Sequence, residues 1–191
     1  ERRQQHDVHP DVVVTGTRRV HLLRGIGDGT LAPQESWGAG LASNSVATGD
    51  FNGDGRRDFV VGNQTSNNVM VLLNDSDITF GYQHAFAAGA GPRYMRLADL
   101  NEDGRRDLVV ANDTSGTVSV LLAAEGVGYL PQSQFACGLR PQSVAVGDAN
   151  LDGHIDVATA DYGSNTISLL LGTGAGSLYA ALPQATGAGP V

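Results

Sequence analysis

Short, mostly apolar runs recur along the chain at a fixed spacing. Three of them lie 49 residues apart, at residues 69–73, 118–122 and 167–171. No apolar stripe of helical period and useful length is present, so these runs predict strands with both faces covered. The glycine-rich and polar segments before and after each run predict hairpin turns. The pattern therefore predicts an all-β fold with four strands in each repeated unit.

The N-terminal segment is a fourth, degenerate copy of the same unit. Residues 20–23 align with residues 69–72 at the 49-residue shift, and residues 11–14 align with residues 58–61 at a shift of 47. Equivalent positions of the four units lie near residues 3, 50, 99 and 148. Tandem four-stranded units of roughly 40 to 50 residues are typical of the blades of a β-propeller.

Three of the units carry the same acidic segment, D-x-N-x-D-G-x-x-D, which we call loop 1 (residues 50–58), loop 2 (99–107) and loop 3 (148–156). Oxygen-bearing side chains at positions 1, 3, 5 and 9, glycine at position 6 and a backbone carbonyl at position 7 form a cage suited to Ca²⁺. The sequence therefore predicts three calcium sites. The expected ligand residues, with position 7 included for its carbonyl, are Asp50, Asn52, Asp54, Arg56 and Asp58; Asp99, Asn101, Asp103, Arg105 and Asp107; and Asp148, Asn150, Asp152, His154 and Asp156.

Two other types of loop have similar sequences, an acidic surface turn and an EF-hand. An acidic surface turn of the Asx type would need no ion. However, carboxylates a few ångströms apart repel by about 4 kcal/mol per pair at an effective dielectric constant near 20, which favours a bound cation. An EF-hand would need glutamate at position 12 and helices on both sides. Position 12 is instead Val61, Val110 or Thr159, and the flanking residues are β-like, so each loop is expected to join two strands.

The degenerate unit has lost most of this motif. Its loop positions 1, 3, 5, 7 and 9 are Arg3, Gln5, Asp7, His9 and Asp11, and Val8 replaces the glycine. This loop is therefore expected to bind calcium weakly or not at all. Two interpretations stay open: the Arg3 guanidinium takes the place of the ion by pairing with Asp7 and Asp11, or the terminus has no defined structure.

The composition of the chain agrees with a calcium-binding all-β fold and adds few further constraints. The formal charge of −8 is mostly metal chemistry, since nine of the twenty acidic residues are the aspartates of the three loops and three Ca²⁺ would leave about −2. No basic footprint for nucleic acid is present. Cys137 is the single cysteine, and small residues stand one period away at Ala88 and Thr186, which favours a packed thiol. There is no apolar run of membrane-spanning length and no secretory leader, so the chain is expected to begin as a mature or excised segment.

Several segments resemble the FG-GAP/VCBS repeats, the family that includes the integrin α-subunit head and lectin-like propellers. They are the cage motif, residues 164–172, residues 27–31, and Phe80-Gly81 followed by residues 89–92. The resemblance implies a β-propeller built from four tandem four-stranded blades of about 49 residues, with a calcium loop between the first two strands of a blade. Residues 1–191 would form one propeller, part of a larger ring, or half of a homodimer that completes a ring, with residues 189–191 beginning the strand that the first blade lacks.

One column of residues tests how neighbouring blades meet. Trp37, Phe86 and Phe135 lie 49 residues apart, and Gln184 takes this position in the last unit. Aromatic rings can stack on sugars, but a ring that recurs in the outer strand of three units favours packing between blades. The glutamine indicates that the last blade lacks an ordinary neighbour on that side.

The resemblance implies a calcium-binding, extracellular or cell-surface module, whose ligand is a glycan or an extracellular protein. The alternatives are a structural scaffold and a non-catalytic domain of a larger sugar-active enzyme. Ligand contacts or ordinary turn chemistry are both open for the polar hairpin tips around Asn63, Asn112, Asp113, Asp161 and Tyr162. None of the five histidines lies in a catalytic motif, so no enzymatic activity is expected.

Overall fold

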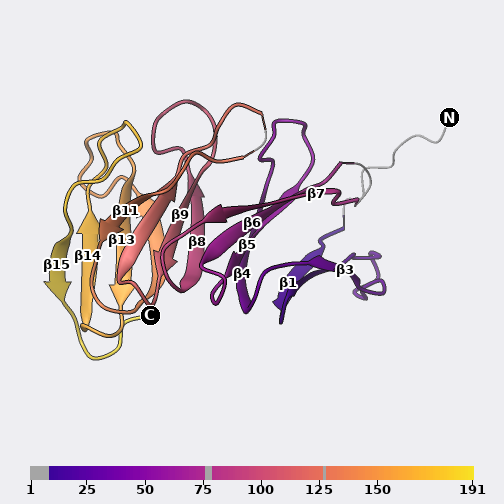
Figure 1. The fold of residues 1–191 in the computed structure, drawn as a ribbon, viewed down its shortest axis with the longest axis horizontal. Helices are drawn as coiled ribbons and strands as arrows, with labels where there is room; N and C mark the ends of the chain where they lie inside the picture. The colour runs from indigo at the N-terminus through magenta and orange to yellow at the C-terminus, as the bar shows by residue number, and fades with distance from the viewer. Residues whose placement is uncertain (1–8, 76–78, 127) are drawn as a thin grey trace.

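The computed structural model describes residues 9–75, 79–126 and 128–191, and every regular element in these ranges is a β-strand. The strands form four antiparallel sheets in which neighbours follow chain order (Figure 1). The first sheet contains β1 (Val12–Gly16), β2 (Arg19–Leu23) and β3 (Glu35–Gly38). The second contains β4 (Ser43–Gly49), β5 (Asp58–Asn63), β6 (Asn68–Leu73) and β7 (Tyr82–Ala87). The third contains β8 (Pro92–Ala98), β9 (Asp107–Asn112), β10 (Thr117–Leu121) and β11 (Ser133–Ala136). The fourth contains β12 (Pro141–Gly147), β13 (Asp156–Asp161), β14 (Thr166–Leu170) and β15 (Leu182–Ala185).

The repeat predicted from the sequence is visible in this arrangement. Three units form four-stranded sheets, and the strand before each acidic loop lies at one edge of its sheet. The degenerate first unit has three strands among the described residues. Its first strand, β1, is equivalent to β5, and no described strand precedes it. Residues 189–191 do not form the missing strand.

Three layers of apolar side chains hold the sheets together. The first and second sheets meet through Val20, Leu22, Phe59, Val61 and Leu72. The second and third sheets meet through Val60, Val69, Val71, Leu108 and Val110, and the third and fourth through Val109, Val118, Val120, Val157 and Leu170. Strands β5 and β9 are buried along their whole length, as expected of strands with both faces covered.

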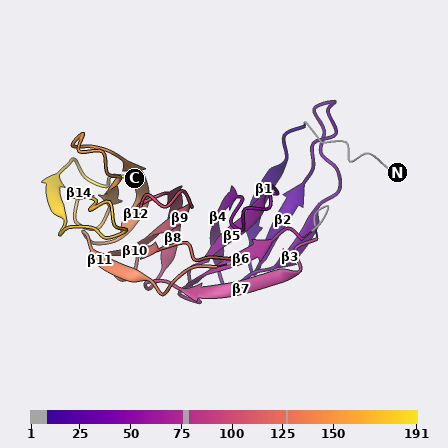
Figure 2. The same ribbon diagram turned by 90° about the horizontal axis from the view of Figure 1, so that it is seen from above.

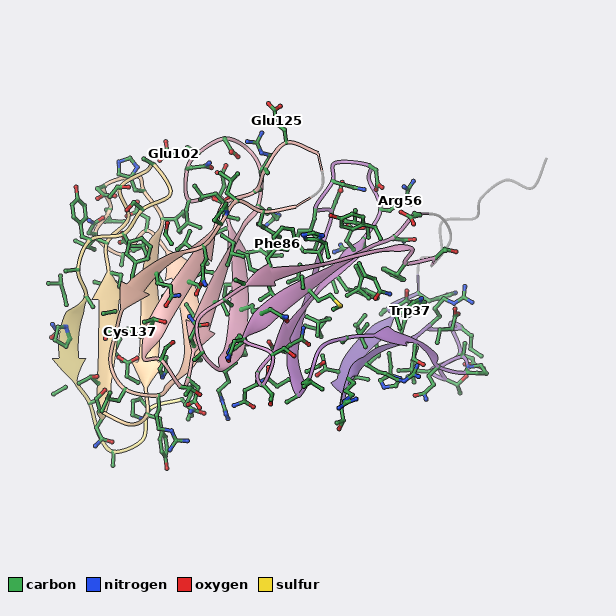
Figure 3. All side chains as sticks on the ribbon, viewed as in Figure 1. Trp37, Arg56, Phe86, Glu102, Glu125 and Cys137 are labelled. Atoms are coloured by element: carbon green, nitrogen blue, oxygen red, sulfur yellow. The ribbon has the colours of Figure 1, made fainter. Side chains whose placement is uncertain are left out.

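The aromatic column lies at these layers. Trp37 meets Phe80 edge to face with ring centroids 4.6 Å apart, and Phe86 meets Tyr129 edge to face at 5.6 Å. Figure 3 shows Trp37 and Phe86 among the strands, and Phe135 packs in the third layer. Gln184 stands on β15, whose residues are all exposed. The packing interpretation of the column is therefore confirmed.

The four sheets stand side by side along an open arc (Figure 2). The inner strands contact one another in the order β1, β4, β8 and β12, whereas β12 makes no comparable contact with β1. The described part of the chain is therefore an arc of propeller-like sheets and does not close into a ring. In this part, no helix has the length and apolar character that crossing a membrane requires.

Candidate metal loops and concave surface

The three acidic loops occupy equivalent places in their sheets. Loop 1 joins β4 to β5, loop 2 joins β8 to β9, and loop 3 joins β12 to β13, so the prediction that each loop joins two strands is confirmed. Figure 3 shows Arg56 of loop 1 and Glu102 of loop 2 at the same end of the molecule as Glu125, which lies in the hairpin after β10.

The first aspartate of each loop organises its backbone. In loop 1, Asp50 Oδ1 accepts hydrogen bonds from the amides of Gly53 at 2.7 Å and Asp54 at 3.2 Å, and Oδ2 accepts one from Gly55 at 2.8 Å. Asp99 and Asp148 accept the same bonds from positions 5 and 6 of loops 2 and 3. The position-6 glycines have φ of +81°, +83° and +92° in the three loops, a conformation that other residues adopt at a cost.

The aspartate at position 9 is buried in every loop and ties the loop to its sheet. Asp58 accepts from the amide of Phe51 at 2.8 Å and from that of Asn74 at 2.9 Å, and Asp107 and Asp156 accept equivalent bonds. In the degenerate unit, Asp11 accepts from the amide of Gly25 at 3.1 Å, which is the same bond. The alignment at a shift of 47 is therefore correct at this position. The expected positions of Arg3, Gln5 and Asp7 lie outside the described residues.

Negative charge gathers around these buried carboxylates. Burial raises the pKa of Asp58 and that of Asp107 above the ordinary value, hydrogen bonds from backbone amides oppose the shift, and the two other aspartates of each loop raise it further. At position 5, Arg56 lies 2.5 Å from Asp54 and Arg105 lies 2.7 Å from Asp103. These exposed arginines neutralise the aspartate at position 5. Among the described residues, neither arginine forms an ion pair with the buried aspartate at position 9.

The carboxylate, side-chain amide and backbone carbonyl oxygens of the three loops are the kinds of ligand that Ca²⁺ prefers. Asn101 Oδ1, the expected position-3 ligand of loop 2, is buried and has no hydrogen-bond partner. In loops 1 and 3 the same oxygen accepts an amide hydrogen bond, at 3.1 Å from Asp54 and 3.0 Å from Asp152. Among the described residues, no three His, Cys, Asp or Glu side chains are arranged to hold a metal by themselves. A cage therefore requires the asparagine oxygen, the position-7 carbonyl, and a position-5 carboxylate that turns from its arginine towards the ion.

The loops differ in how they are covered by the next sheet. Phe51 of loop 1 lies under Tyr129, with ring centroids 6.4 Å apart. Loop 2 lies under the hairpin between β14 and β15, where the Gly176 amide donates to the Leu100 carbonyl at 3.0 Å. No described residue covers loop 3 in this way, and Leu151 is 88% exposed. The motif predicts three similar loops, and this difference has no signal within the motif itself.

Loops 2 and 3 also contact each other. His154 Nδ1 lies 2.7 Å from Glu102 Oε1, and this hydrogen bond is the main cause of the raised pKa of His154. His154 was expected to contribute only its backbone carbonyl, so its side-chain contact with the neighbouring sheet is an addition to that expectation.

A cavity of about 760 Å³ opens between the inner strands and the fourth sheet. Tyr94, Arg96 and Gln142 form part of its polar wall, and Ala158 and Ile167 form part of its apolar wall. The Arg96 guanidinium lies 4.4 Å from the centre of the Tyr94 ring and donates to the Met95 carbonyl at 3.2 Å. Sequence reasoning missed this surface. Its signal was the polar alternation of Tyr94 and Arg96, which places both side chains on one side of β8.

The hairpin-tip residues are mostly structural. Asn63, Asn112 and Asp161 are buried and bond to Ser43, Ser119 and Ser168 at 2.9, 2.8 and 2.6 Å. Asp113 accepts from Gln142 at 2.7 Å, and Tyr162 remains exposed. These contacts agree with ordinary turn chemistry for the three buried residues.

Cys137 is a packed thiol, as the sequence predicted. It lies partly buried against the layer between the third and fourth sheets. Burial raises the pKa of its thiol to about 12, and the nearby Asp161 adds to the shift. Little reactive thiolate is therefore present at neutral pH.

Comparison with solved structures supports the propeller-like arrangement. A crystal structure of BBS1N in complex with ARL6DN, soaked with lead, is similar with a TM-score of 0.60 and 14% sequence identity over 97% of this chain and 55% of that chain. The chain thus spans about half the length of this neighbour. The pore of the Photorhabdus luminescens Tc holotoxin matches with a TM-score of 0.45 and 16% identity, over 96% of this chain and 9% of that one. At these identities the first likeness shows the fold alone.

Comparison by sequence gives a family. No curated protein matches the chain. The model of the FG-GAP-like repeat matches three overlapping segments, residues 6–61, 50–110 and 99–159. These segments include all three acidic loops, the strands on both sides of loops 1 and 2, the strand before loop 3 and the first part of β13. The chain therefore belongs to the FG-GAP-like repeat family of β-propeller repeats.

Proposed function

We propose that this chain is a non-catalytic, extracellular binding module whose propeller sheets are stabilised by calcium in loops 1, 2 and 3. The observation that carries the calcium assignment is the buried, unpartnered Asn101 Oδ1 beside the aspartates of loop 2. A bound Ca²⁺ would supply the missing partner and neutralise the clustered carboxylates. Sites of this kind suit the high calcium concentrations outside cells.

Calcium would have a structural role in this proposal. Asp107 already links loop 2 to the strand β10 side of the sheet through the Ala123 amide, and Asp99 shapes the loop backbone. An ion held by these two aspartates, Asn101, Asp103 and the Arg105 carbonyl would fix the corner between β8 and β9. Loops 1 and 3 would hold their ions through the equivalent residues.

The concave cavity is the proposed place for a ligand. Its wall combines an aromatic ring, a guanidinium held in place by that ring, and the amide of Gln142. Such a mixture suits the polar groups of a glycan or of a protein surface. The BBS1N structure is itself a protein complex, with ARL6DN, which supports a protein partner by analogy. A scaffold that contacts only other domains remains the alternative function.

Calcium binding is tested by thermal melting in the presence of calcium or of EDTA. A calorimetric titration of the metal-free protein with calcium measures the binding directly. We expect calcium to raise the melting temperature, since a ligand at 100 times its Kd stabilises the native state by about 2.7 kcal/mol per site. Asp103→Asn should remove one site from the titration and reduce the shift. Asp28→Asn is the matched control, because Asp28 is an exposed turn aspartate outside the three loops that bonds to Thr30. No heat of binding and equal melting in EDTA would contradict the assignment.

The ligand is tested separately with a glycan array and with binding measurements on the calcium-loaded protein. Reproducible sugar binding that Arg96→Ala weakens would support a lectin-like module. Absence of sugar binding together with binding of a protein that Arg96→Ala weakens would support a protein-interaction module. Absence of both would support the scaffold.

A further inference from the structure

The inner strand of the third sheet departs from the repeat at three residues. Arg93, Tyr94 and Arg96 of β8 line the concave cavity, and Figure 2 shows β8 between β4 and β12 along the arc. The equivalent residues one period away are Asn44, Ser45 and Ala47 in β4 and Gln142, Ser143 and Ala145 in β12. Neutral and smaller side chains therefore suit the fold at these positions, and the packing of the repeat does not require two arginines and a tyrosine in β8.

Tyr94 and Arg96 lie on the same face of the third sheet, as residues two apart on a strand do. Their register partners on β9 are Ala111 and Val109, which pack in the layer between the third and fourth sheets. Met95, which stands between them, is 4% exposed and packs on the opposite face, towards the second sheet. Tyr94 and Arg96 are both exposed at the inner edge of their sheet, where the cavity opens.

Positive charge in this cavity is not balanced by an acidic side chain. No lining residue is Asp or Glu, and none of the ion pairs among the described residues includes Arg93 or Arg96. The chain as a whole has a formal net charge of −8, so two such guanidinium groups in one hollow are a local exception. A concave wall focuses the field of its charges. The cavity therefore favours a ligand with negative charge.

The Arg96 guanidinium is held in place by its neighbours. It lies 4.4 Å from the centre of the Tyr94 ring, and Nη1 donates to the Met95 carbonyl at 3.2 Å. The planar fork of N–H groups in a guanidinium matches the two oxygens of a carboxylate. Because the side chain is already ordered, less conformational entropy is lost on binding. The guanidinium also covers one face of the Tyr94 ring, which leaves less of the ring for stacking on a sugar.

Side-chain amides also contribute to the polar wall. Asn44, Gln64 and Gln142 line the same cavity as the two arginines. Gln142 Nε2 donates to Asp113 Oδ1 at 2.7 Å, which fixes this amide and leaves its Oε1 as an acceptor. An amide both donates and accepts hydrogen bonds, as does the peptide group of an extended chain. The wall therefore suits a peptide with a carboxylate side chain better than it suits a small inorganic anion.

We propose that the concave cavity binds an acidic segment of a partner protein, an inference that rests on the proposed function of this cavity. Arg93 and Arg96 would bind the carboxylate of an Asp or Glu side chain. The amides of Asn44, Gln64 and Gln142 would bind the peptide backbone. These residues lie on the inner strands β4, β8 and β12 and in the turn after β5.

An array of short peptides that differ in their content of Asp and Glu tests the ligand class. It is probed with the whole, calcium-loaded chain, and fluorescence anisotropy then measures the Kd of the peptide that binds best. We expect that peptide to be acidic. Replacing its Asp and Glu residues by Asn and Gln should weaken binding by about 10- to 100-fold, as expected for the loss of a charge-assisted hydrogen bond. Added NaCl should weaken binding too.

Two variants of the chain take their residues from the neighbouring unit. Arg93→Gln and Arg96→Ala introduce the residues that β12 has at the same positions, so both should fold, with melting temperatures close to that of the unchanged chain. Each should raise the Kd of the acidic peptide by about 10- to 100-fold. Arg19→Gln is the matched control, because it removes the same charge from an exposed residue of β2 outside the cavity. It should leave the Kd unchanged.

Other outcomes would overturn the proposal in distinguishable ways. An acidic peptide that binds equally well to both variants would lie elsewhere, for example at a calcium loop, and would overturn the role of the arginines. Preference for neutral or basic peptides, weakened by Arg96→Ala, would overturn the acidic ligand and leave the cavity as a binding site. Heparin is the probe for an acidic glycan, and tighter binding of heparin than of any peptide would overturn the protein partner. Binding of no peptide would overturn the inference as well, whereas the calcium titration tests the metal loops independently.

Discussion

The buried aspartate at position 9 shows how one side chain organises a whole unit. Asp107 receives one hydrogen bond from Leu100 at the start of loop 2 and one from Ala123 after β10, so it joins three segments of the same sheet. No ion pair of the described residues reaches this carboxylate, and burial raises its pKa. Asp58 has the same arrangement and a pKa raised for the same reason.

The raised pKa values predict a pH dependence of stability that calcium should change. The folded chain binds protons at Asp58 and Asp107 more tightly than the unfolded chain does. Their contribution to stability is therefore present below the ordinary aspartate pKa and is lost as pH rises through the raised folded-state values. The exposed Asp54, Asp103 and Asp152 act in the opposite direction with lowered pKa values, but solvent screens them.

We expect the metal-free protein to lose this part of its unfolding free energy between a pH of about 4 and neutrality. With saturating calcium the loss should largely disappear, because the ion favours the charged carboxylates. Denaturant unfolding at several pH values, in EDTA and in calcium, measures both profiles. Parallel profiles in the two conditions would show that no ion reaches these aspartates.

Residue types and spacing predicted which residues make up the loops, but not the hydrogen bonds that each of them forms. The motif identified Asp50, Asp99 and Asp148 because oxygen ligands must recur at fixed positions. It gave no reason to distinguish Asn101 from Asn52, since both are position-3 asparagines. Their hydrogen bonds nevertheless differ in the folded chain, and a pattern of residue types does not contain that difference.

At the scale of elements, a second column at the 49-residue period controls how each inner strand begins. Gly40, Gly89 and Gly138 pass so close to Asn63, Asn112 and Asp161 that an added Cβ would lie about 2.5 Å from their side-chain atoms. Glycine is required there by the close approach of the backbone to a buried polar side chain. Gly187 holds the same position in the last unit and has no atom within 4 Å.

Gly89→Ala should therefore destabilise the protein by about 1–3 kcal/mol, as expected for overpacking a buried contact. Gly187→Ala is the matched control and should change the unfolding free energy much less. Urea unfolding of both variants under the same conditions measures the difference. Equal effects of the two substitutions would mean that the contact with Asn112 is not what requires glycine.

The repeat period predicted most of the elements because strand pattern and turn chemistry agree in every unit. Residues 69–73 and 118–122 were expected as strands, and the structure has β6 and β10 there. The three-stranded first sheet followed from the alignment of residues 11–14 with residues 58–61. Whether the sheets close was not predictable, because closure depends on small rotations between packed sheets that no short pattern specifies.

For the whole molecule, the position of a loop along the arc should decide how strongly it holds an ion. Loop 2 is covered by the hairpin of the fourth sheet, whereas loop 3 has exposed Ala149 and Leu151 at its surface. We expect calcium to dissociate from loop 3 first. Asp103→Asn should therefore reduce the stabilisation by calcium more than Asp152→Asn does, as measured by melting over a range of free calcium. The reverse order would show that cover by the next sheet does not control affinity.

The cover of loop 2 by the hairpin around Gly176 also has a consequence during synthesis. A ribosome releases residues 99–107 long before it releases the residues that seal them, so this corner cannot mature when its own strands first pair. Loops 1 and 2 would each be completed only after the following unit has folded against them. An ion retained at Asp99 would then signal that the following unit has arrived and docked.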